Sequence, residues 1–547
     1  METKQCAGCS KDFTVEKADI DFYEKLGVPT PDKCPNCRLK MRLAFWPFGK
    51  FHVRNCDLSG ERIISIFPPK AKFPVYKTSN WYSDSWEVPA LDYDPDAKFL
   101  DQVAKLQSLT PHPHQSGAKN TDCDSSDDAW ECKKCYLCRS MANCENVSYG
   151  YRMLHCRDSQ ELTYCFDTEE SYDCTLCSKI SHIKYALNVR DSFDSVFLYD
   201  CRNVSNCFMC WNLRNKEYNI MNVQYSKEDY FKTIAQYDLG SSAQVENLKT
   251  EFNKLLQTQA VHRINNNIKT INSTGNFLTE NKGCRQCFFL ETSEDCSHLF
   301  RGNTNKDCID SIGLLKCELF YDSVQMGEGY NVKHSMFCTN CRDSEYLDFC
   351  IDCVDCFGCV SLRKKQYYIL NKQYNKEDYE KLVAEIKEKM KKDGAGDHFF
   401  PIKMAQTGYN LSLAQTYFPE TEEGVKKFGG EWEELEKTES KGRETIPFPD
   451  NTKDVTDDVV TKALVCEATG RLFSINKDDL EFYRKNNIPI PHLYCDERTM
   501  RRLRLMPFAT STKANCTFCN KEMVSYFPPE WGYERIACED CYKREIA

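Results

Sequence analysis

Cysteine spacing is the feature of this chain that most constrains its fold. Cysteines recur at steps of 21 residues in two separate blocks, and in each block two such columns run nine residues apart. The columns of the first block contain Cys123, Cys144, Cys165 and Cys207, and Cys135, Cys156 and Cys177. Those of the second block contain Cys296, Cys317, Cys338 and Cys359, and Cys287, Cys308 and Cys350. Several columns that share one step indicate an internal repeat.

A repeat of this length predicts a parallel β-solenoid. At about 3.3 Å per residue, one repeat makes a closed turn of three or four short strands. Because the turns stack about 4.8 Å apart, each residue of a column lies directly above the equivalent residue of the previous repeat. Asp-Ser pairs such as Asp158-Ser159 and Asp310-Ser311 recur where the chain must turn. We therefore predict a mainly β fold with about 21 residues per solenoid turn.

The solenoid block is duplicated. Cys132 reappears 152 positions later as Cys284, and further along the offset becomes 149. Each copy closes with a tyrosine-rich stretch and a predicted helix, for which Ser226 or Asn375 is the N-cap. These closing segments are candidates for the capping ends that solenoids need.

The N-terminal stretch predicts a zinc site. Cys6-x-x-Cys9 and Cys34-x-x-Cys37 enclose 24 residues. Four thiolates in two such pairs suit tetrahedral zinc. The alternative is that these are four ordinary buried cysteines.

This stretch resembles an uncharacterised family described as a probable zinc-ribbon domain. The resemblance rests on the two cysteine pairs and on Phe13, Phe22-Tyr23-Glu24-Lys25-x-Gly27 and Arg38. It covers roughly 40 residues and implies a zinc site without any activity. The whole layout resembles cysteine-rich proteins of unknown function from small-genome uncultivated bacteria, which implies no mechanism either.

The C-terminus repeats the N-terminus 460 positions later. In this copy Thr469 and Glu497 stand at the positions of Cys9 and Cys37, so its first site lacks four cysteines. Its second half supplies a zinc-ribbon spacing with Cys516, Cys519, Cys538 and Cys541. The matching N-terminal positions hold Cys56, Ser59, Thr78 and Trp81. We infer that each terminal module descends from two fused ribbons, and we predict at least two zinc ions, one at each end.

The chain is therefore expected to have the order A–B–B′–A′, where A and A′ are ribbon modules and B and B′ are solenoid blocks. The predicted segments are a ribbon module at 1–92, a linker at 93–121, block B at 122–225 and a helical connector at 226–275. They continue with block B′ at 276–374, a capping helix at 375–393, an acidic linker or arm at 394–460 and the second ribbon module at 461–547.

Composition limits the function classes. The net charge of −10 argues against binding of nucleic acid or anionic membrane over the whole surface. There is no run of 18 apolar residues and no apolar signal segment at the start. With 34 cysteines, the chain is expected in a reducing, cytoplasmic setting, where cysteine clusters favour metal over disulfide.

A basic segment interleaved with aromatic residues follows the first ribbon of each module. The cations considered for nucleic-acid binding are Arg38, Lys40, Arg42 and Arg54, and Arg498, Arg501, Arg502 and Arg504. Such segments can pair with phosphates and stack on bases. The alternative is that the aromatic residues are core and the cations solvate one face.

Two interpretations of the middle cysteines compete. In the first, cysteine is a small buried hydrophobe that fills an inner column. In the second, dense clusters hold further metal, as zinc or as an iron–sulfur cluster. The candidates are Cys132, Cys135, Cys138, Cys284, Cys287, Cys338, Cys341, Cys353, Cys356 and Cys359.

The sequence contains no recognisable catalytic constellation or small-molecule site. Closed four-cysteine sites leave zinc no open position for a substrate. We therefore expect a non-enzymatic, zinc-binding scaffold whose partner is RNA or DNA, held by the basic segments. The competing hypothesis is a protein-assembly module that uses the solenoid faces, and a weaker one is a metal store or redox protein.

Overall fold

The computed structural model describes residues 1–48, 50–123, 125–163, 166–169, 171–315, 321–394, 396, 398–434, 444–506, 508 and 510–546. The chain forms two compact units, and each unit combines two separate stretches. Unit 1 consists of Met1–Gln115 and Asn265–Glu433, and unit 2 of Ser116–Ile264 and Glu434–Ala547. The first ribbon module therefore belongs with the second solenoid block, and the first block with the second module.

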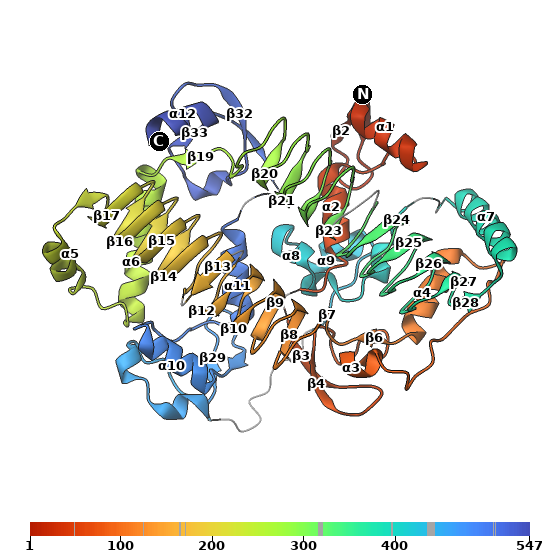
Figure 1. The fold of residues 1–547 in the computed structure, drawn as a ribbon, viewed down its shortest axis with the longest axis horizontal. Coiled ribbons are helices and arrows are strands. Elements are labelled where there is room, and N and C mark those ends of the chain that lie inside the picture. The colour runs from red at the N-terminus through yellow and green to blue at the C-terminus, as the bar shows by residue number, and fades with distance from the viewer. Residues whose placement is uncertain are drawn as a thin grey trace. The chain divides into compact units, whose positions relative to one another are not determined.

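The first solenoid block, in unit 2, is one continuous sheet of parallel strands (Figure 1). Only β18 runs antiparallel, to β17. The strands are β7 (Gly117–Ala118), β8 (Ser125–Trp130), β9 (Tyr136–Ala142), β10 (Glu145–Ser148), β11 (Tyr151–Leu154), β12 (Arg157–Gln160), β13 (Phe166–Glu169), β14 (Ser178–Leu187), β15 (Arg190–Tyr199), β16 (Arg202–Trp211), β17 (Arg214–Ile220) and β18 (Val223–Gln224). The predicted parallel β-solenoid is confirmed.

The predicted turn length is wrong, because one turn takes 12 residues rather than 21. Ser178 pairs with Arg190, Arg190 with Arg202, and Arg202 with Arg214. The repeating unit is three residues long, and four such units close one turn. The cysteine steps of nine and 21 are both multiples of three, so the columns in the sequence follow the tripeptide and not the turn.

Backbone conformation explains this short repeat. The residue before each inward-facing position adopts the left-handed region, as at Glu131, Lys134 and Leu137, with φ of 55°, 52° and 51°. Each residue in the left-handed conformation bends the chain, and four such bends complete one turn of the solenoid. Asn and Asp tolerate this region best. Side chains at the same corner of successive turns also bond to one another, as Asn188 Nδ2 donates to Asp200 at 3.1 Å.

The second block, in unit 1, has the same construction. Gly275 pairs with Cys287 and Gly329 with Cys341, again 12 residues apart. Its strands are β20 (Gly275–Thr279), β21 (Cys287–Glu291), β22 (Phe300–Asn303), β23 (Ile312–Leu315), β24 (Gly329–Lys333), β25 (Cys341–Glu345), β26 (Val354–Phe357), β27 (Gln366–Ile369) and β28 (Lys372–Gln373). The predicted columns pass through Cys165 and Cys317, which lie outside the described residues.

Each block ends in a short antiparallel strand pair, followed by the helix that the sequence predicts. The helices are α5 (Lys227–Ile234) after block B and α7 (Lys376–Lys392) after block B′. The side chain of Ser226 accepts a hydrogen bond from Asp229 N at 3.1 Å, and that of Asn375 from Asp378 N at 2.9 Å. These N-caps satisfy backbone donors that a helix start leaves free. The connector then continues with α6 (Ser242–Thr258) and β19 (His262–Arg263).

The two ribbon modules repeat one order of elements: hairpin, two helices, hairpin, strand and helix. The first contains β1 (Glu2–Gln5), β2 (Asp12–Val15), α1 (Lys17–Leu26), α2 (Pro35–Leu43), β3 (His52–Asn55), β4 (Arg62–Ser65), β5 (Val75–Tyr76) and α3 (Thr78–Trp81). The second contains β29 (Leu464–Val465), β30 (Leu472–Phe473), α10 (Lys477–Lys485), α11 (Cys495–Arg504), β31 (Thr512–Asn515), β32 (Glu522–Ser525), η5 (Pro529–Trp531), β33 (Ile536–Ala537) and α12 (Glu539–Ile546).

The described parts of the two remaining segments contain helices and short strands. Residues 93–121 contain α4 (Phe99–Leu109) and β6 (His112–Pro113), and the Phe99 ring lies 4.8 Å from that of Phe357. The arm carries η1 (Ile402–Met404), η2 (Tyr409–Leu411), α8 (Leu413–Tyr417), α9 (Glu422–Lys427), η3 (Thr452–Asp454) and η4 (Asp457–Val460). Most of its Glu-rich stretch, residues 435–443, lies outside the described residues.

Candidate metal centres

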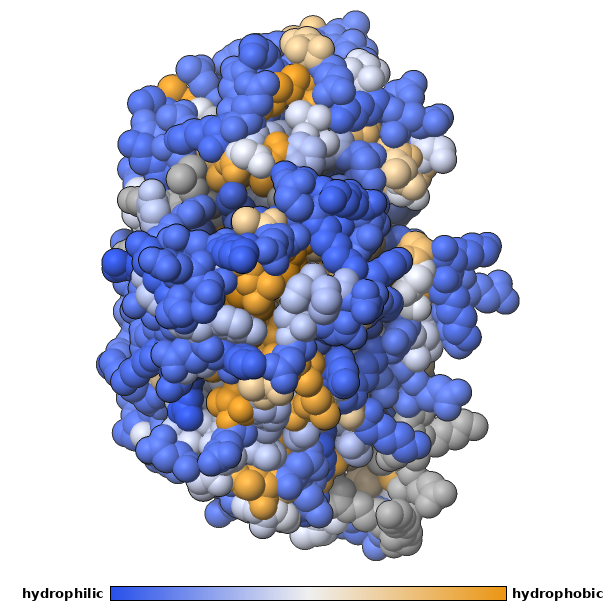
Figure 2. Space-filling model, turned by 90° about the vertical axis from the view of Figure 1, so that its right-hand side faces the viewer, coloured by the Kyte–Doolittle hydropathy of each residue, from blue (hydrophilic) through white to orange (hydrophobic). Residues whose placement is uncertain are grey.

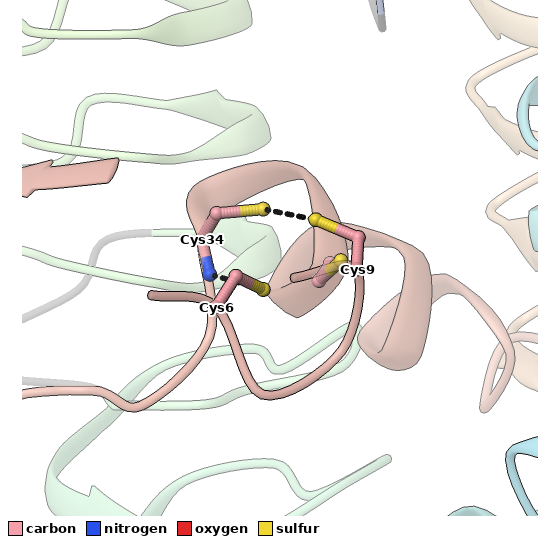
Figure 3. Close-up of side chains that lie close together, drawn as sticks. Cys6, Cys9 and Cys34 are labelled. Carbon is pink, nitrogen blue, oxygen red and sulfur yellow. Dashed lines mark hydrogen bonds between the residues drawn. The ribbon is translucent and has the colours of Figure 1, made fainter. Parts of the chain in front are cut away.

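The first candidate centre joins the β1–β2 turn to the start of α2. The sulfur atoms of Cys6, Cys9, Cys34 and Cys37 all lie within 4.8 Å of one another. Cys9 Sγ and Cys34 Sγ are 3.8 Å apart (Figure 3). Four sulfurs at the Zn–S distance of about 2.3 Å around a tetrahedral ion would be about 3.8 Å apart. The four side chains therefore fit zinc.

Backbone N–H groups point at the sulfur of Cys6 in this centre. Cys34 N donates at 3.2 Å and Gly8 N at 3.3 Å. Burial alone would raise the pKa of the Cys6 thiol, but these N–H groups lower it to about 6. The pKa of Cys37 is raised instead, by burial and by the neighbouring thiols. Such donors favour a thiolate, the form that binds metal.

The second candidate centre has the same construction at the other end of the chain. Cys516 and Cys519 lie in the β31–β32 turn, and Cys538 and Cys541 at the start of α12. Cys519 Sγ and Cys538 Sγ are 3.7 Å apart, and Cys538 N donates to Cys516 Sγ at 3.3 Å. Burial opposes ionisation of Cys516, but backbone donors lower its pKa to about 6. Both ends can therefore hold a metal ion in a closed four-sulfur site.

Each module also contains a second loop of the same kind, in which most of the positions that match the four cysteines hold other residues. All four ribbon loops share one backbone hydrogen bond, from the first loop residue to the carbonyl five positions on. It is 2.9 Å long from Cys6 and from Cys516, and 2.8 Å long from Cys56 and from Cys466. This common loop supports the inference that each module arose from two fused ribbons.

Side-chain packing replaces the metal in these two ribbons. In the first module, Trp81 is 1% exposed and its Nε1 donates to Pro111 O at 3.0 Å. In the second module, the Arg471 guanidinium lies 3.7 Å from the centre of the Tyr494 ring and pairs with Asp496. Tyr494 stands at the position of Cys34, so a cation–π contact takes the place of the ligands.

The middle cysteines have different surroundings from the terminal ones. Cys341 Sγ faces the carbonyls of Thr339 and Cys350, at 3.6 and 3.4 Å, and Cys353 Sγ faces those of Ile351 and Leu362, at 3.4 and 3.3 Å. A carbonyl oxygen accepts a hydrogen bond from a thiol but repels a thiolate. Among the described residues, the two terminal groups are those in which ligand atoms converge enough for a metal. This geometry favours the interpretation of the solenoid cysteines as packing residues.

The predicted basic segments do not form an open cationic surface, because most of their side chains are buried in ion pairs with acids of the solenoid or of their own module. Arg38 Nε lies 2.9 Å from Asp310 Oδ1, and Arg42 is paired with the same carboxylate at 3.0 Å. Lys40 pairs with Glu420, and Arg54 with Asp57 at 2.7 Å.

The second module repeats this burial. Arg498 lies 2.9 Å and Arg502 2.6 Å from Glu161, which is 1% exposed. Arg501 and Arg504 remain exposed on α11. The structure therefore corrects the placement of Arg38, Lys40, Arg42, Arg54, Arg498 and Arg502, whose charges are all paired with acids, and all of which except the half-buried Lys40 are buried or nearly so.

Sequence reasoning missed the two acids at the centre of these contacts. The sequence marks Asp310 only as a turn residue and does not single out Glu161. Both occupy left-handed corners and are 149 positions apart, whereas the neighbouring cysteines repeat at 152. This shift of one tripeptide conceals the correspondence, so the cysteine offset gives no signal for it.

No family model matches the chain, and no curated protein matches it. The resemblance to a zinc-ribbon family therefore stays a prediction. Within the described part of the chain, no helix is long and apolar enough to cross a membrane.

Proposed function

We propose that the protein is a non-enzymatic scaffold that binds two zinc ions and presents the outer faces of its solenoid blocks to another protein. The observation that carries this proposal is the pair of four-cysteine centres, which are closed on all sides by sulfur. Zinc in such a site has no open position for a substrate or a reactive water. The metal would therefore stabilise structure rather than perform chemistry.

The outer faces of the solenoid supply the proposed binding surface. Lysine and glutamate on neighbouring turns alternate there, as in Lys133 with Glu145 at 2.8 Å and Lys282 with Glu294 at 2.6 Å. Figure 2 shows one face of the molecule, on which hydrophilic residues predominate and apolar residues form small patches. Mixed charge of this kind suits a protein partner better than a uniformly anionic nucleic acid. We propose that the protein works in a reducing compartment such as the cytoplasm, where clustered cysteines bind metal more readily than they form disulfides.

Elemental analysis tests the metal part of this proposal. We expect two zinc ions per chain, and the variants Cys9→Ser and Cys519→Ser should each retain one. Ser59→Ala changes the loop position that corresponds to Cys9 in a metal-free ribbon, so this control should keep two. Fewer than two zinc ions in the unaltered protein would contradict the proposal.

Cross-linking in extracts of the source cells tests the partner. Lysine-reactive cross-links should join Lys133 and Lys282 repeatedly to one protein, and reversing these two charges to Glu should reduce the amount of that protein recovered with the chain by affinity capture. Lys513, 84% exposed on the β31–β32 hairpin, is the control position for the same reversal. Scattered cross-links with no common protein would count against a protein-binding scaffold.

Nucleic-acid binding is the second candidate, favoured only by the exposure of Arg501 and Arg504. It predicts that labelled single-stranded RNA or DNA binds more weakly as salt rises, and that Arg501→Ala with Arg504→Ala removes most of the affinity. Anisotropy measurements that show no salt-dependent binding would eliminate this candidate and leave the protein-binding proposal unaffected.

A further inference from the structure

Two of the contacts between each ribbon module and its solenoid block are here called the first dock and the second dock. The first dock is made by the second helix of the module, α2 in unit 1 and α11 in unit 2. The second dock is made at the last helix, α3 in unit 1 and α12 in unit 2. Both docks rest on acids or arginines of the solenoid.

The first docks are buried charge clusters. In unit 1, Asp310 is fully buried and pairs with Arg38 and Arg42, while Tyr23 Oη donates to it at 2.5 Å. In unit 2, Glu161 takes the corresponding place, with Arg498 and Arg502 around it. Removing one partner from such a cluster leaves an uncompensated buried charge, so each first dock depends on the position of its helix.

Each second dock uses one arginine of its own solenoid block. In unit 1, Arg363 Nη1 donates to Tyr82 O at 2.6 Å, and its guanidinium lies 5.4 Å from the Trp81 ring. In unit 2, Arg214 Nη2 donates to Tyr542 Oη at 2.6 Å, and the same hydroxyl donates to Asp200. Arg263 adds an ion pair with Glu539 in the first turn of α12, at 2.6 Å.

The docks of the two units correspond residue by residue. Within the modules, Arg38, Arg42 and Tyr82 correspond to Arg498, Arg502 and Tyr542, each 460 positions later. Within the blocks, Asp310 and Arg363 correspond to Glu161 and Arg214, each 149 positions earlier. The same two contacts are therefore made twice in the chain.

The candidate metal centres support different docks in the two units. In unit 1, the ligand Cys37 directly precedes Arg38 of the first dock. In unit 2, the ligand Cys541 directly precedes Tyr542 of the second dock. The second dock of unit 1 and the first dock of unit 2 belong to the metal-free ribbons. The first of these ribbons is packed around Trp81 and the other around Arg471 and Tyr494.

We propose that each zinc ion controls one dock and leaves the other dock of the same unit unaffected. Zinc at the first centre fixes the start of α2 and so keeps Arg38 and Arg42 on Asp310. Zinc at the second centre fixes the start of α12 and so keeps Tyr542 on Arg214 and Asp200. Loss of metal would then release the metal-dependent dock of each module, while the metal-free dock would hold the rest of the module in place. This inference rests on the proposed zinc sites.

Hydrogen exchange followed by mass spectrometry on the full chain tests the inference. In Cys9→Ser, amides of α2 should exchange at least tenfold faster, while those of α3 and of α11 keep their protection. In Cys519→Ser, amides of β33 and α12 should exchange at least tenfold faster, while those of α11 and α2 do not change. Ser59→Ala and Thr469→Ala alter the matching positions of the metal-free ribbons and should leave all four helices unchanged.

The outcomes separate this inference from the proposed function. If each variant loses one zinc ion but exchange at the docks is unchanged, or if both docks of a unit loosen together, zinc-controlled docking is refuted while the zinc sites stand. If the unaltered protein holds no zinc, the proposed function fails as well. If a cysteine variant does not fold, metal can instead be removed stepwise from the unaltered protein with a chelator. Hydrogen exchange of the same peptides then tests the same prediction.

Discussion

At the scale of single residues, two buried acids organise the contacts between modules and solenoid blocks. Asp310 and Glu161 are 0% and 1% exposed, and each is surrounded by two arginines. Desolvation raises the pKa of Asp310, but the charges of Arg38 and Arg42 lower it well below its usual range. The carboxylate therefore stays ionised inside the protein because its cations are brought in with it.

Replacing Asp310 by Asn should be strongly destabilising. It removes the carboxylate that the two buried arginines share, a change that costs about 3–5 kcal/mol. Asp343 is a suitable control, because it lies at an exposed corner where its carboxylate only accepts a hydrogen bond from Asn331. Asp343→Asn should change the free energy of unfolding by about 0.5 kcal/mol or less. Denaturant unfolding of both variants checks this, and equal effects would contradict the assignment of Asp310 as the central acid.

Asp19 makes the first module sensitive to acid. Burial raises its pKa, but His298 and Arg285 on the solenoid lower it further, to about 2, against an ordinary value of 3.8. A folded pKa below the unfolded one stabilises the protein above the unfolded value, and this stabilisation is lost as the pH falls from about 4 to 2. The shift corresponds to roughly 2 kcal/mol. Unfolding measured between pH 5 and 2 should show this loss, and Asp19→Asn should flatten the curve in that range.

At the scale of elements, the solenoid turn depends on left-handed corners. Lys364 has φ of 54° and is exposed, whereas the exposed neighbour Lys365 is not in the left-handed region. A β-branched residue is disfavoured where φ is positive. The two lysines therefore offer the same substitution in two backbone conformations.

Lys364→Val should destabilise block B′ by about 1–2 kcal/mol, since valine would have to occupy the left-handed corner. Lys365→Val should change stability by no more than about 0.5 kcal/mol. Lys364→Gly should be tolerated, because glycine adopts this conformation without steric cost. Thermal unfolding of the three variants measures the difference, and equal melting temperatures for the two valine variants would disprove the role of the corner.

The sequence was sufficient to predict a parallel solenoid, its duplication, its helical caps and both four-cysteine centres. These features depend on residue types at fixed steps, which a single sequence displays. The turn length was not predictable from the cysteine columns, because steps of nine and 21 fit a tripeptide as well as a full turn. The burial of Arg38 and Arg502 in ion pairs was not predictable either, since their acidic partners lie 272 and 341 residues away in the sequence.

At the scale of the whole molecule, the units do not follow the order of the chain. Modules and blocks succeed one another as A–B–B′–A′, but A belongs with B′ and A′ with B. Unit 1 therefore runs from module to block and unit 2 from block to module, so the units are circular permutations of one design. The solenoid strands contain none of the terminal metal ligands.

Removal of both metals should therefore leave most of the β-sheet intact. The solenoid core is filled by inward side chains that do not need zinc, whereas the ribbons depend on it. Treatment with a strong chelator should release two zinc ions and change the far-ultraviolet circular dichroism only slightly. Collapse of the sheet signal on metal removal would show that the solenoid needs zinc.

The interleaved order has a consequence for synthesis on the ribosome. Arg38 is made 272 residues before Asp310, which at about 5–20 residues per second is a delay of roughly 15–50 s. During this time the first module has two arginines without their acid, and only block B is available beside it. Arg502 is made 341 residues after Glu161, so the last module emerges when its block is already complete. The arginines of the first module can therefore pair wrongly with acids of block B before Asp310 is made. The arginines of the last module meet their own acid without such a delay.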